Sequence, residues 1–314
     1  MSHPRNFPDV IPSGWFQIGY SDRVKPGEVY PLRYFDRDLV MFRTEDGELA
    51  VLDAHCPHLG AHLGHGGKVR GSEIECHFHA WRFATNGKCT AVPYASHQPR
   101  KAGVGSWRVK QLANMIFCWH HPAGEDPDWD IPDTIPEYGD DEWTEWETDD
   151  WVVRSCNKDM NENGFDSAHF RFLHGTTNTP ESEASFDGPR FRAYAATGME
   201  TPRGPVQGSV ESHGHGFGLG IVRFKGVVET LNIGTTTPID HEHCHLRFNF
   251  SVRKLGGAEI TRGVGKAFVA EVKRQVEQDI PIWENKIHLP QPLLCDGDGP
   301  IAEYRRWAEQ FYRR

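Results

Sequence analysis

The chain has 314 residues, of which 38% are hydrophobic and 25% charged, and its formal net charge at pH 7 is −10. Its apolar runs all fall short of the roughly 18 residues that a membrane helix needs, and its first residues lack the basic and apolar segments of a signal peptide. No basic surplus exists to neutralise phosphates, which argues against nucleic-acid binding. The seven cysteines have no paired spacing, so we expect reduced thiols and a cytoplasmic protein without a membrane span.

Residues 1–125 are predicted to form an antiparallel β domain. Short apolar runs such as Leu39–Phe42 and Met115–Trp119 alternate here with turn signals, among them Glu45-Asp46-Gly47. Apolar runs of this length, separated by Asp, Asn and Gly, are typical of strands joined by tight turns.

An acidic segment, residues 126–150, is predicted to connect this domain to a second one, residues 151–314. It lies in a stretch, residues 121–150, that has thirteen acidic residues and no Lys or Arg. Because several prolines interrupt the segment, an extended and solvated connection is expected. An acidic docking patch for a basic partner is the alternative.

The strongest motif in the chain combines cysteines and histidines in two loops of the first domain. Cys56-Pro57-His58 is followed, 17 residues later, by Cys76-His77-Phe78-His79. Each loop offers one thiolate and one imidazole, whereas a structural zinc site more often takes both cysteines from one turn. This distribution suits a two-iron cluster with two Cys on one iron and two His on the other. A zinc-stabilised knuckle is the alternative.

His169 and His174 are the candidate metal ligands of the second domain. Asp166 lies one turn before His169 and would share its face on a helix, so that its carboxylate could orient the imidazole or accept its proton. His174 falls about 140° from His169 on a regular helix. Both histidines can therefore bind one metal only if the helix ends between them, and Gly175 is consistent with such an end.

A carboxylate is expected to complete this site, because two histidines and one carboxylate form the facial triad of many non-haem iron sites. On a helix drawn through Phe268 and Trp283, Asp279 lies on the apolar stripe, while the neighbouring glutamates lie on the opposite face. A carboxylate on a buried face needs a partner, and a metal ion is a good one. Asp279 is therefore predicted to be the third ligand. The alternative is a carboxylate at the helix edge, or one that caps a break made by Pro281.

These motifs resemble those of a known family. The stretches Cys56-Pro-His58-Leu-Gly and Cys76-His-Phe-His79-Ala-Trp81 are similar to the two cluster-binding loops of Rieske [2Fe–2S] proteins. The segment from Glu162 to His174 and the stretch Asp279-Ile-Pro-Ile-Trp283 resemble the iron-binding segments of Rieske non-haem iron oxygenases. The resemblance implies an α+β protein, in which an N-terminal antiparallel β Rieske domain precedes a helix-grip (START-like) catalytic domain.

The same resemblance assigns roles to the site residues. It implies that one cysteine and one histidine from each loop hold the [2Fe–2S] cluster, namely Cys56, His58, Cys76 and His79. It implies that Fe(II) is bound by His169, His174 and Asp279. Asp166 would carry electrons from a cluster histidine of the neighbouring subunit in a head-to-tail homotrimer.

Within the family, the C-terminal segments resemble 3-ketosteroid 9α-hydroxylase oxygenase components and cholesterol 7-desaturases, notably at Pro292-Leu-Leu294 and Arg305-Arg-Trp307. This implies the terminal monooxygenase of a multicomponent system of steroid metabolism, which uses O2 and takes electrons from a ferredoxin or a flavin-dependent reductase. No flavin or nicotinamide motif is visible, so neither cofactor is expected to be bound. Hydroxylation of a small, steroid-like hydrophobic substrate at an unactivated C–H bond is the leading hypothesis. The alternatives are sterol 7-desaturation, a non-steroid substrate, and a Rieske electron carrier without catalysis.

Overall fold

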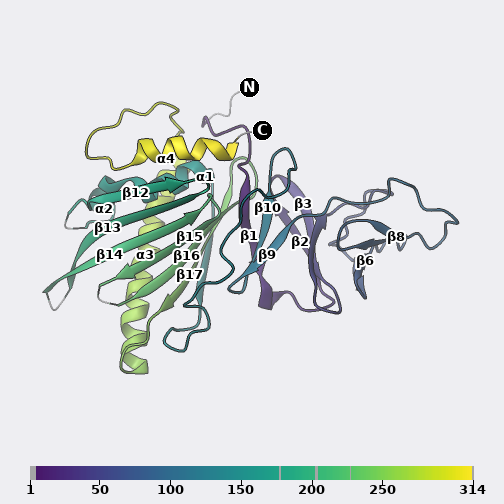
Figure 1. Cartoon of the computed structure of the whole chain (residues 1–314), viewed down its shortest axis with the longest axis horizontal. Coiled ribbons are helices and arrows are strands. Elements are labelled where there is room, and N and C mark those ends of the chain that lie inside the picture. The colour runs from purple at the N-terminus through teal and green to yellow at the C-terminus, as the bar shows by residue number, and fades with distance from the viewer. Residues whose placement is uncertain (1–4, 177, 202–203, 227, 313–314) are drawn as a thin grey trace. The chain divides into compact units, whose positions relative to one another are not determined.

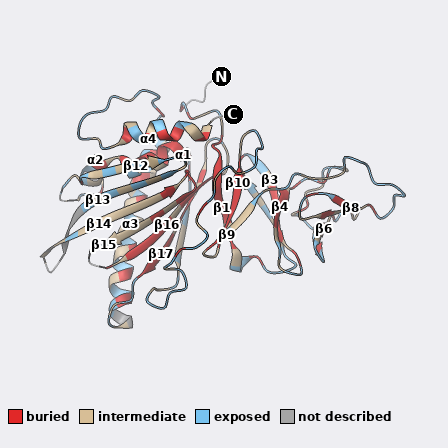
Figure 2. Cartoon of the chain, viewed as in Figure 1, coloured by how far each residue is buried: buried red, intermediate tan, exposed pale blue. Residues whose placement is uncertain are grey.

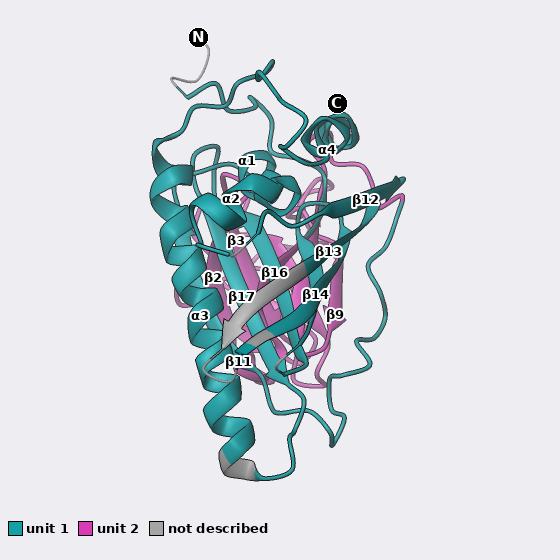
Figure 3. Cartoon of the chain, turned by 90° about the vertical axis from the view of Figure 1, so that its left-hand side faces the viewer, with its two compact units in different colours: residues 1–15, 129–314 teal, residues 16–128 magenta. Residues whose placement is uncertain are grey.

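A computed structural model describes residues 5–176, 178–201, 204–226 and 228–312 (Figure 1). The chain divides into two compact units (Figure 3). The first unit consists of residues 16–128 (magenta). The second consists of residues 1–15 together with 129–314 (teal). The predicted division assigned residues 1–125 to the first domain, so the structure differs from it at the N terminus. Within the described residues, the search for a helix long and apolar enough to cross a membrane finds none.

Short strands make up the unit of residues 16–128, as expected (Figure 1). They form three small sheets, ordered β1-β10-β9, β2-β3-β4 and β5-β6-β7-β8. Neighbouring strands pair antiparallel in the second and third sheets, as do β9 and β10. The elements are β1 (Gly14–Tyr20), η1 (Ser21–Arg23), β2 (Val29–Tyr34), β3 (Arg37–Arg43), β4 (Leu49–Asp53), β5 (Lys68–Arg70), β6 (Glu73–Glu75), β7 (Arg82–Ala84), β8 (Cys89–Ala91), β9 (Val109–Leu112) and β10 (Met115–His120).

Apolar side chains hold these strands together. Every residue of β10 is buried (Figure 2). Phe42, Leu52 and Phe83 pack in one core cluster, and fully burying a side chain of this size contributes about 1.5–3 kcal/mol. The same cluster contains Cys56 and Cys76. The core of this unit therefore anchors both loops of the Cys–His motif.

The second unit is built on a seven-stranded antiparallel sheet ordered β11-β17-β16-β15-β14-β13-β12. The first of these strands in the chain pairs with the last, so that Trp151 lies opposite Leu246. A long helix, α3, lies against one face of the sheet (Figures 1 and 3). This is the expected helix-grip arrangement. The strands are β11 (Glu147–Val153), β12 (Ser182–Asp187), β13 (Arg190–Thr201), β14 (Gly204–His215), β15 (Leu219–Lys225), β16 (Thr230–Pro238) and β17 (Cys244–Val252).

Helices lie before and after the long strands of this sheet. The helix α3 packs through Val276 and Trp283 onto Leu246, and through Val269 onto Phe250. Three short helical segments lie between β11 and β12. The last of them, α2, carries His169, and His174 follows its end. The helical elements are α1 (Asn157–Glu162), η2 (Asn163–Phe165), α2 (Ser167–Phe172), α3 (Ala258–Asn285), α4 (Ile301–Ala308) and η3 (Glu309–Tyr312).

Residues 5–15 contact the C-terminal half of the chain, which explains the altered division. The guanidinium of Arg5 donates hydrogen bonds to the carbonyl oxygens of Trp283 and Lys286, at the end of α3. The backbone N–H of Ser13 donates to the carbonyl of Phe311 at 2.8 Å. These bonds join segments that are distant in sequence, so local patterns do not reveal them.

Residues 129–150 belong to the second unit and do not form a separate connection, although most of them are exposed or half-buried, as expected. The indole N–H of Trp15 donates to the carbonyl of Trp129 at 3.0 Å. Glu137 accepts two hydrogen bonds from Arg223 of β15, at 2.5 and 3.0 Å, and its side chain is only 12% exposed. The strand β11 already begins at Glu147. A carboxylate that meets a guanidinium in this way is packed, not solvated.

Candidate functional site

The two Cys–His loops have the same backbone hydrogen bonds. The N–H of Cys56 donates to the carbonyl of Ala61, and the N–H of Gly60 donates back to the carbonyl of Cys56. In the second loop, the N–H of Cys76 donates to Trp81, and the N–H of Ala80 donates to Cys76. The residue four places after each cysteine has a positive φ, 76° at Gly60 and 56° at Ala80. The loops are therefore equivalent turns, each presenting a cysteine and a histidine.

The cysteines and histidines of these loops converge. Both thiols are buried, and burial together with the neighbouring Cys76 thiol raises the pKa of Cys56 to about 11. The ring centroids of His58 and His79 are 4.6 Å apart, and His58 stacks on the indole of Trp81. The Nδ1 atom of His58 is buried without a hydrogen-bond partner. A buried ring nitrogen of this kind suits a metal ligand, because burying an unsatisfied polar atom is costly.

In the second unit, Asp166 caps the helix α2. Its Oδ1 atom accepts hydrogen bonds from the backbone N–H groups of Ala168 and His169, at 3.0 and 3.2 Å. The sequence suggested that this carboxylate orients the His169 imidazole or takes its proton. Instead, Nδ1 of His169 donates to the backbone carbonyl of Asp166 at 2.6 Å, and the carboxylate lies 4.0 Å away. Asp166 precedes the helix, so its side chain turns to the free N–H groups of the first turn.

The helix α2 ends between the two histidines. This is the condition under which both can bind one metal ion. The helix ends at Phe172, and the N–H groups of Leu173 and His174 both reach the carbonyl of His169. Gly175 follows with a φ of 75°. The two imidazole rings consequently lie next to one another in an edge-to-face arrangement, with centroids 4.9 Å apart.

Asp279 meets these histidines from the helix α3. It is buried, whereas Glu277 on the opposite face is exposed, in agreement with the predicted stripe. Its Oδ1 atom lies 3.4 Å from Nε2 of His174 and accepts no hydrogen bond. Ligand atoms of His169, His174 and Asp279 all lie within 4.8 Å of one another. Two imidazoles and a buried carboxylate whose Oδ1 atom accepts no hydrogen bond are a donor set that fits a divalent non-haem iron ion.

Hydrogen bonds and charge tune the two histidines differently. Burial lowers the pKa of His169, although the nearby Asp279 carboxylate opposes this effect. Burial also disfavours the charged form of His174, but Asp279 and the hydrogen bond with Gln278 outweigh it and raise the pKa. Nε2 of His169 lies 3.2 Å from the side-chain amide of Asn163. No role was predicted for Asn163 or Gln278, since an amide side chain is not a candidate metal ligand in the predicted pattern.

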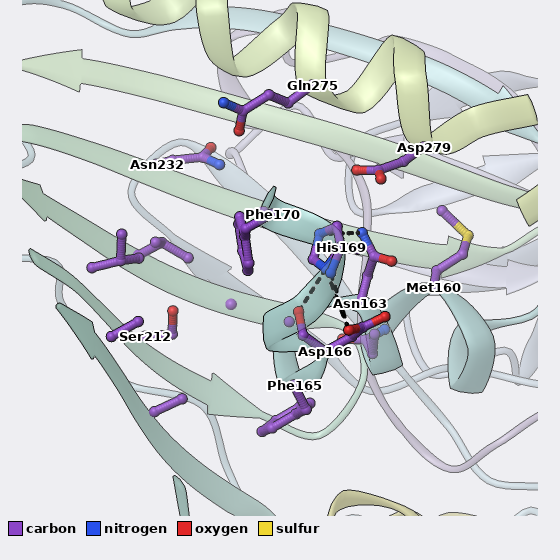
Figure 4. A pocket seen from close by; sticks show the side chains of 18 of the residues that line it. Met160, Asn163, Phe165, Asp166, His169, Phe170, Ser212, Asn232, Gln275 and Asp279 are labelled. Atoms are coloured by element: carbon purple, nitrogen blue, oxygen red, sulfur yellow. Dashed lines mark hydrogen bonds and ion pairs between the residues drawn. The ribbon is translucent and has the colours of Figure 1, made fainter. Parts of the chain in front are cut away.

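A cavity of about 290 Å³ opens on this triad (Figure 4). Its walls are mainly apolar and come from the segments α1 to α2, from β12 to β17 and from α3, with Phe165, Val222 and Phe248 among them. Asn232 of β16 points into it, and its Oδ1 atom is buried without a hydrogen-bond partner. Sequence reasoning missed Asn232 too, because a single asparagine on an apolar strand carries no spacing signal.

Comparisons with known proteins identify both units. The Rieske [2Fe–2S] domain matches residues 14–113, and the 3-ketosteroid 9α-hydroxylase C-terminal domain matches residues 118–312. A 3-ketosteroid-9-alpha-monooxygenase oxygenase component of Rhodococcus rhodochrous is 33% identical, covering 95% of this chain and 82% of the relative. Cholesterol 7-desaturase nvd 1 of Ciona intestinalis is 31% identical, covering 98% of this chain and 70% of the relative.

Solved structures show the same fold at lower sequence identity. Dicamba monooxygenase bound to dicamba has a TM-score of 0.77 at 18% identity, covering 99% of this chain and 98% of that one. NdmB of Pseudomonas putida CBB5 has a TM-score of 0.76 at 17% identity, covering 95% and 90%.

The sequence relatives settle the class of protein. The 3-ketosteroid-9-alpha-monooxygenase relatives are oxygenase components, so this chain is an oxidoreductase with a Rieske cluster and iron as cofactors and a reductase or ferredoxin as partner. The expected α+β fold with an N-terminal Rieske domain is confirmed. The chain belongs to the family of Rieske oxygenase components that have a 3-ketosteroid 9α-hydroxylase C-terminal domain.

Proposed function

We propose that this chain is a terminal monooxygenase that uses O2 and electrons from a reductase to hydroxylate a steroid-like substrate at an unactivated C–H bond. The observation that carries the proposal is the apolar cavity that opens on His169, His174 and Asp279. The steroid class is supported by the oxygenase component of Rhodococcus rhodochrous, which aligns over 95% of this chain.

The two Cys–His loops hold the Rieske cluster in this proposal. Its ligands are two thiolates and two imidazoles, from Cys56, His58, Cys76 and His79. Each loop contributes one thiolate and one imidazole. This distribution supports a two-iron cluster over a single zinc ion.

Fe(II) is the metal proposed for the triad. When bound there, it supplies the activation of O2 toward a C–H bond, with electrons that arrive through the Rieske cluster. The chain's own contribution is to hold two neutral imidazoles and one carboxylate on one side of the metal position. This leaves the side toward the cavity for O2 and substrate. No bound flavin or nicotinamide is proposed, so the electrons come from the partner reductase.

Asp166 is proposed to bridge neighbouring chains in a homotrimer. Its side chain is 33% exposed, and its backbone carbonyl holds the imidazole of His169. The residue therefore touches an iron ligand while part of its carboxylate stays free for a cluster histidine of the neighbouring chain. The head-to-tail trimer follows from the family resemblance.

Asn232 is proposed to bind a polar group of the substrate. The Oδ1 atom of its side-chain amide is buried without a hydrogen-bond partner, and most of the cavity wall around it is apolar. An amide offers both an oxygen acceptor and an N–H donor, so it suits either a hydroxyl or a ketone. A steroid combines a rigid apolar body with such groups at its edge.

Sterol 7-desaturation is the second candidate. The desaturase relative from Ciona intestinalis aligns over 98% of this chain at 31% identity, close to the value for the hydroxylase relatives. Both reactions begin with removal of hydrogen from an unactivated C–H bond. They then differ in whether hydroxyl is returned or a second hydrogen is removed.

A substrate panel tests the proposal. The protein is incubated with a ferredoxin reductase, NADH and O2, and offered 3-ketosteroids and sterols, with products read by mass spectrometry. Gain of one oxygen on a 3-ketosteroid supports the hydroxylase, and loss of two hydrogens from a sterol supports the desaturase. If neither class reacts while O2 still reoxidises the reduced cluster, the steroid assignment is wrong.

A further inference from the structure

We propose that Gln278 is a positioning residue that fixes the tautomer and orientation of His174 and so sets the metal affinity of the triad. The inference rests on the proposed function of the triad as a metal site. It concerns a side chain that does not itself touch the metal position.

The geometry places Gln278 behind the ligand ring. Nδ1 of His174 lies 3.0 Å from Oε1 of Gln278, and Nε2 on the other side of the ring lies 3.4 Å from Oδ1 of Asp279. The side chain of His174 is only 2% exposed. Water therefore has little access to take the place of the amide oxygen.

The chemistry of the amide decides which nitrogen is free. A carbonyl oxygen only accepts hydrogen bonds, so Nδ1 of His174 must carry the hydrogen that Gln278 accepts. A neutral imidazole has one N–H, and its other nitrogen therefore keeps a lone pair. Gln278 thereby leaves the lone pair of Nε2 facing Asp279 and His169, where a metal would lie. An imidazole without this partner would be free to take the other tautomer or to rotate.

The second histidine is oriented in a different way. Nδ1 of His169 donates to the backbone carbonyl of Asp166 at 2.6 Å, so the fold itself fixes that ring. For His174 the acceptor is a side chain, and substitution can therefore test it. Gln278 is also the residue next to Asp279 in α3. A single helix thus delivers the third ligand and the group that orients the second one.

A neutral acceptor has a further consequence for the charge at the site. The triad already contains the carboxylate of Asp279, and Gln278 adds a hydrogen bond without a second negative charge. A glutamate here would keep the acceptor and add that charge. The nearest cation on the same helix face, Arg274, already pairs with Glu271. Gln278→Glu therefore tests whether a hydrogen-bond acceptor at this position is enough, or whether the neutral amide is needed.

Metal affinity is the measurement, because it does not depend on turnover. Protein that retains its Rieske cluster but lacks the second metal is titrated anaerobically with Co(II) against a fluorescent chelator, and the Co(II) visible bands are recorded. We expect Gln278→Leu to weaken Co(II) binding about 10- to 100-fold, in line with other orienting partners of ligand histidines. Gln278→Glu should restore most of the affinity. Thermal midpoints and the cluster absorbance should match the parent in both variants.

Two controls make the result decisive. Glu277→Gln changes the neighbouring exposed residue and should leave Co(II) affinity unchanged. The positioning role is refuted if Gln278→Leu binds Co(II) like the parent, if Gln278→Glu is as weak as Gln278→Leu, or if Glu277→Gln is equally weak. Asp279→Ala separates the two proposals. If both Gln278→Leu and Asp279→Ala bind Co(II) like the parent, the proposed metal site is wrong. If Asp279→Ala loses Co(II) binding and Gln278→Leu does not, only the role of Gln278 is refuted.

Discussion

Nε2 of His174 lies 3.4 Å from Oδ1 of Asp279, although His174 follows α2 and Asp279 belongs to α3, far apart in the sequence. Both side chains are buried, and the carboxylate oxygen accepts no hydrogen bond. Burying an ionised carboxylate without a partner is costly. A cation between the two groups removes this cost, so the pair is best understood as two sides of a metal site.

Removing the carboxylate should therefore remove the second metal and leave the cluster in place. In Asp279→Ala we expect the iron content to fall from about three atoms per chain to about two, the number in a Rieske cluster. Iron analysis combined with visible absorbance measures both sites. An unchanged iron content would contradict the assignment. Glu277→Ala, on the exposed face of the same helix, is the matched control.

Two variants of Asp166 should separate its role in capping the helix α2 from its proposed role in electron transfer. Asparagine caps a helix about as well as aspartate, whereas alanine at this position costs about 0.5–2 kcal/mol. Asp166→Asn should therefore keep the stability of the parent and both metals, while Asp166→Ala loses some stability. If the carboxylate carries electrons between chains, both variants lose coupled turnover. Normal product formation in Asp166→Asn would show that the carboxylate is not the bridge.

The acidic residue Asp159 should make stability depend on pH. Burial alone would raise the pKa of this carboxyl, but the hydrogen bond with His288 and the nearby charge of Lys286 outweigh burial and lower the pKa below its usual value. A lowered pKa in the folded state means that the charged carboxylate stabilises the fold. This contribution is present above the unfolded value of about 3.9 and is lost as the pH falls through the folded value.

Asp159→Asn should consequently be less stable than the parent at pH 7, by about 1.5–3 kcal/mol, because it removes the buried hydrogen bond between the carboxylate and His288. The difference should shrink once the pH falls below about 4. Urea unfolding followed by tryptophan fluorescence at several pH values measures it. A difference that stays constant or grows toward low pH would contradict the account. The control is Asp126, an exposed residue that pairs with the exposed Arg108. Asp126→Asn should leave the urea midpoint of unfolding unchanged.

Asn232 should determine affinity more than the rate of the chemical step. Asn232→Leu removes the amide but keeps a similar volume, so a ketone or hydroxyl of the substrate loses its partner in an apolar cavity. We expect KM to rise about 10- to 100-fold, since an unpaired buried polar group costs about 1–3 kcal/mol, while kcat changes little. An apolar analogue without the polar group should bind the variant no worse than the parent. Equal losses for both ligands would point to a general disturbance of the cavity.

The ligand candidates were predictable because each rests on a local regularity. The Cys–His loops have a fixed spacing, and the apolar stripe of α3 follows the helical period, which placed Asp279 on the buried face. The end of α2 between His169 and His174 followed from the angle between them. These signals need only a few neighbouring residues.

Other features depend on contacts between distant segments, and the sequence does not reveal them. Arg5 bonds the end of α3, and Glu137 pairs with Arg223. Judged from their own residues alone, the segments around Arg5 and Glu137 look solvated. The capping role of the Asp166 carboxylate was also missed. The free N–H groups at the start of the helix α2 compete with the His169 imidazole for this carboxylate, and they bind it. Gln278 gains its role only from the fold, which brings it behind His174.

A single-turnover experiment with 18O2 tests the central claim most directly. The fully reduced protein, with both metals and without reductase, is mixed with a 3-ketosteroid and 18O2, and the product is analysed by mass spectrometry. The account predicts a hydroxylated steroid that contains one atom of 18O, and no product from Asp279→Ala. A product that contains only 16O, or oxidation of the cluster without any product from every steroid offered, would contradict it.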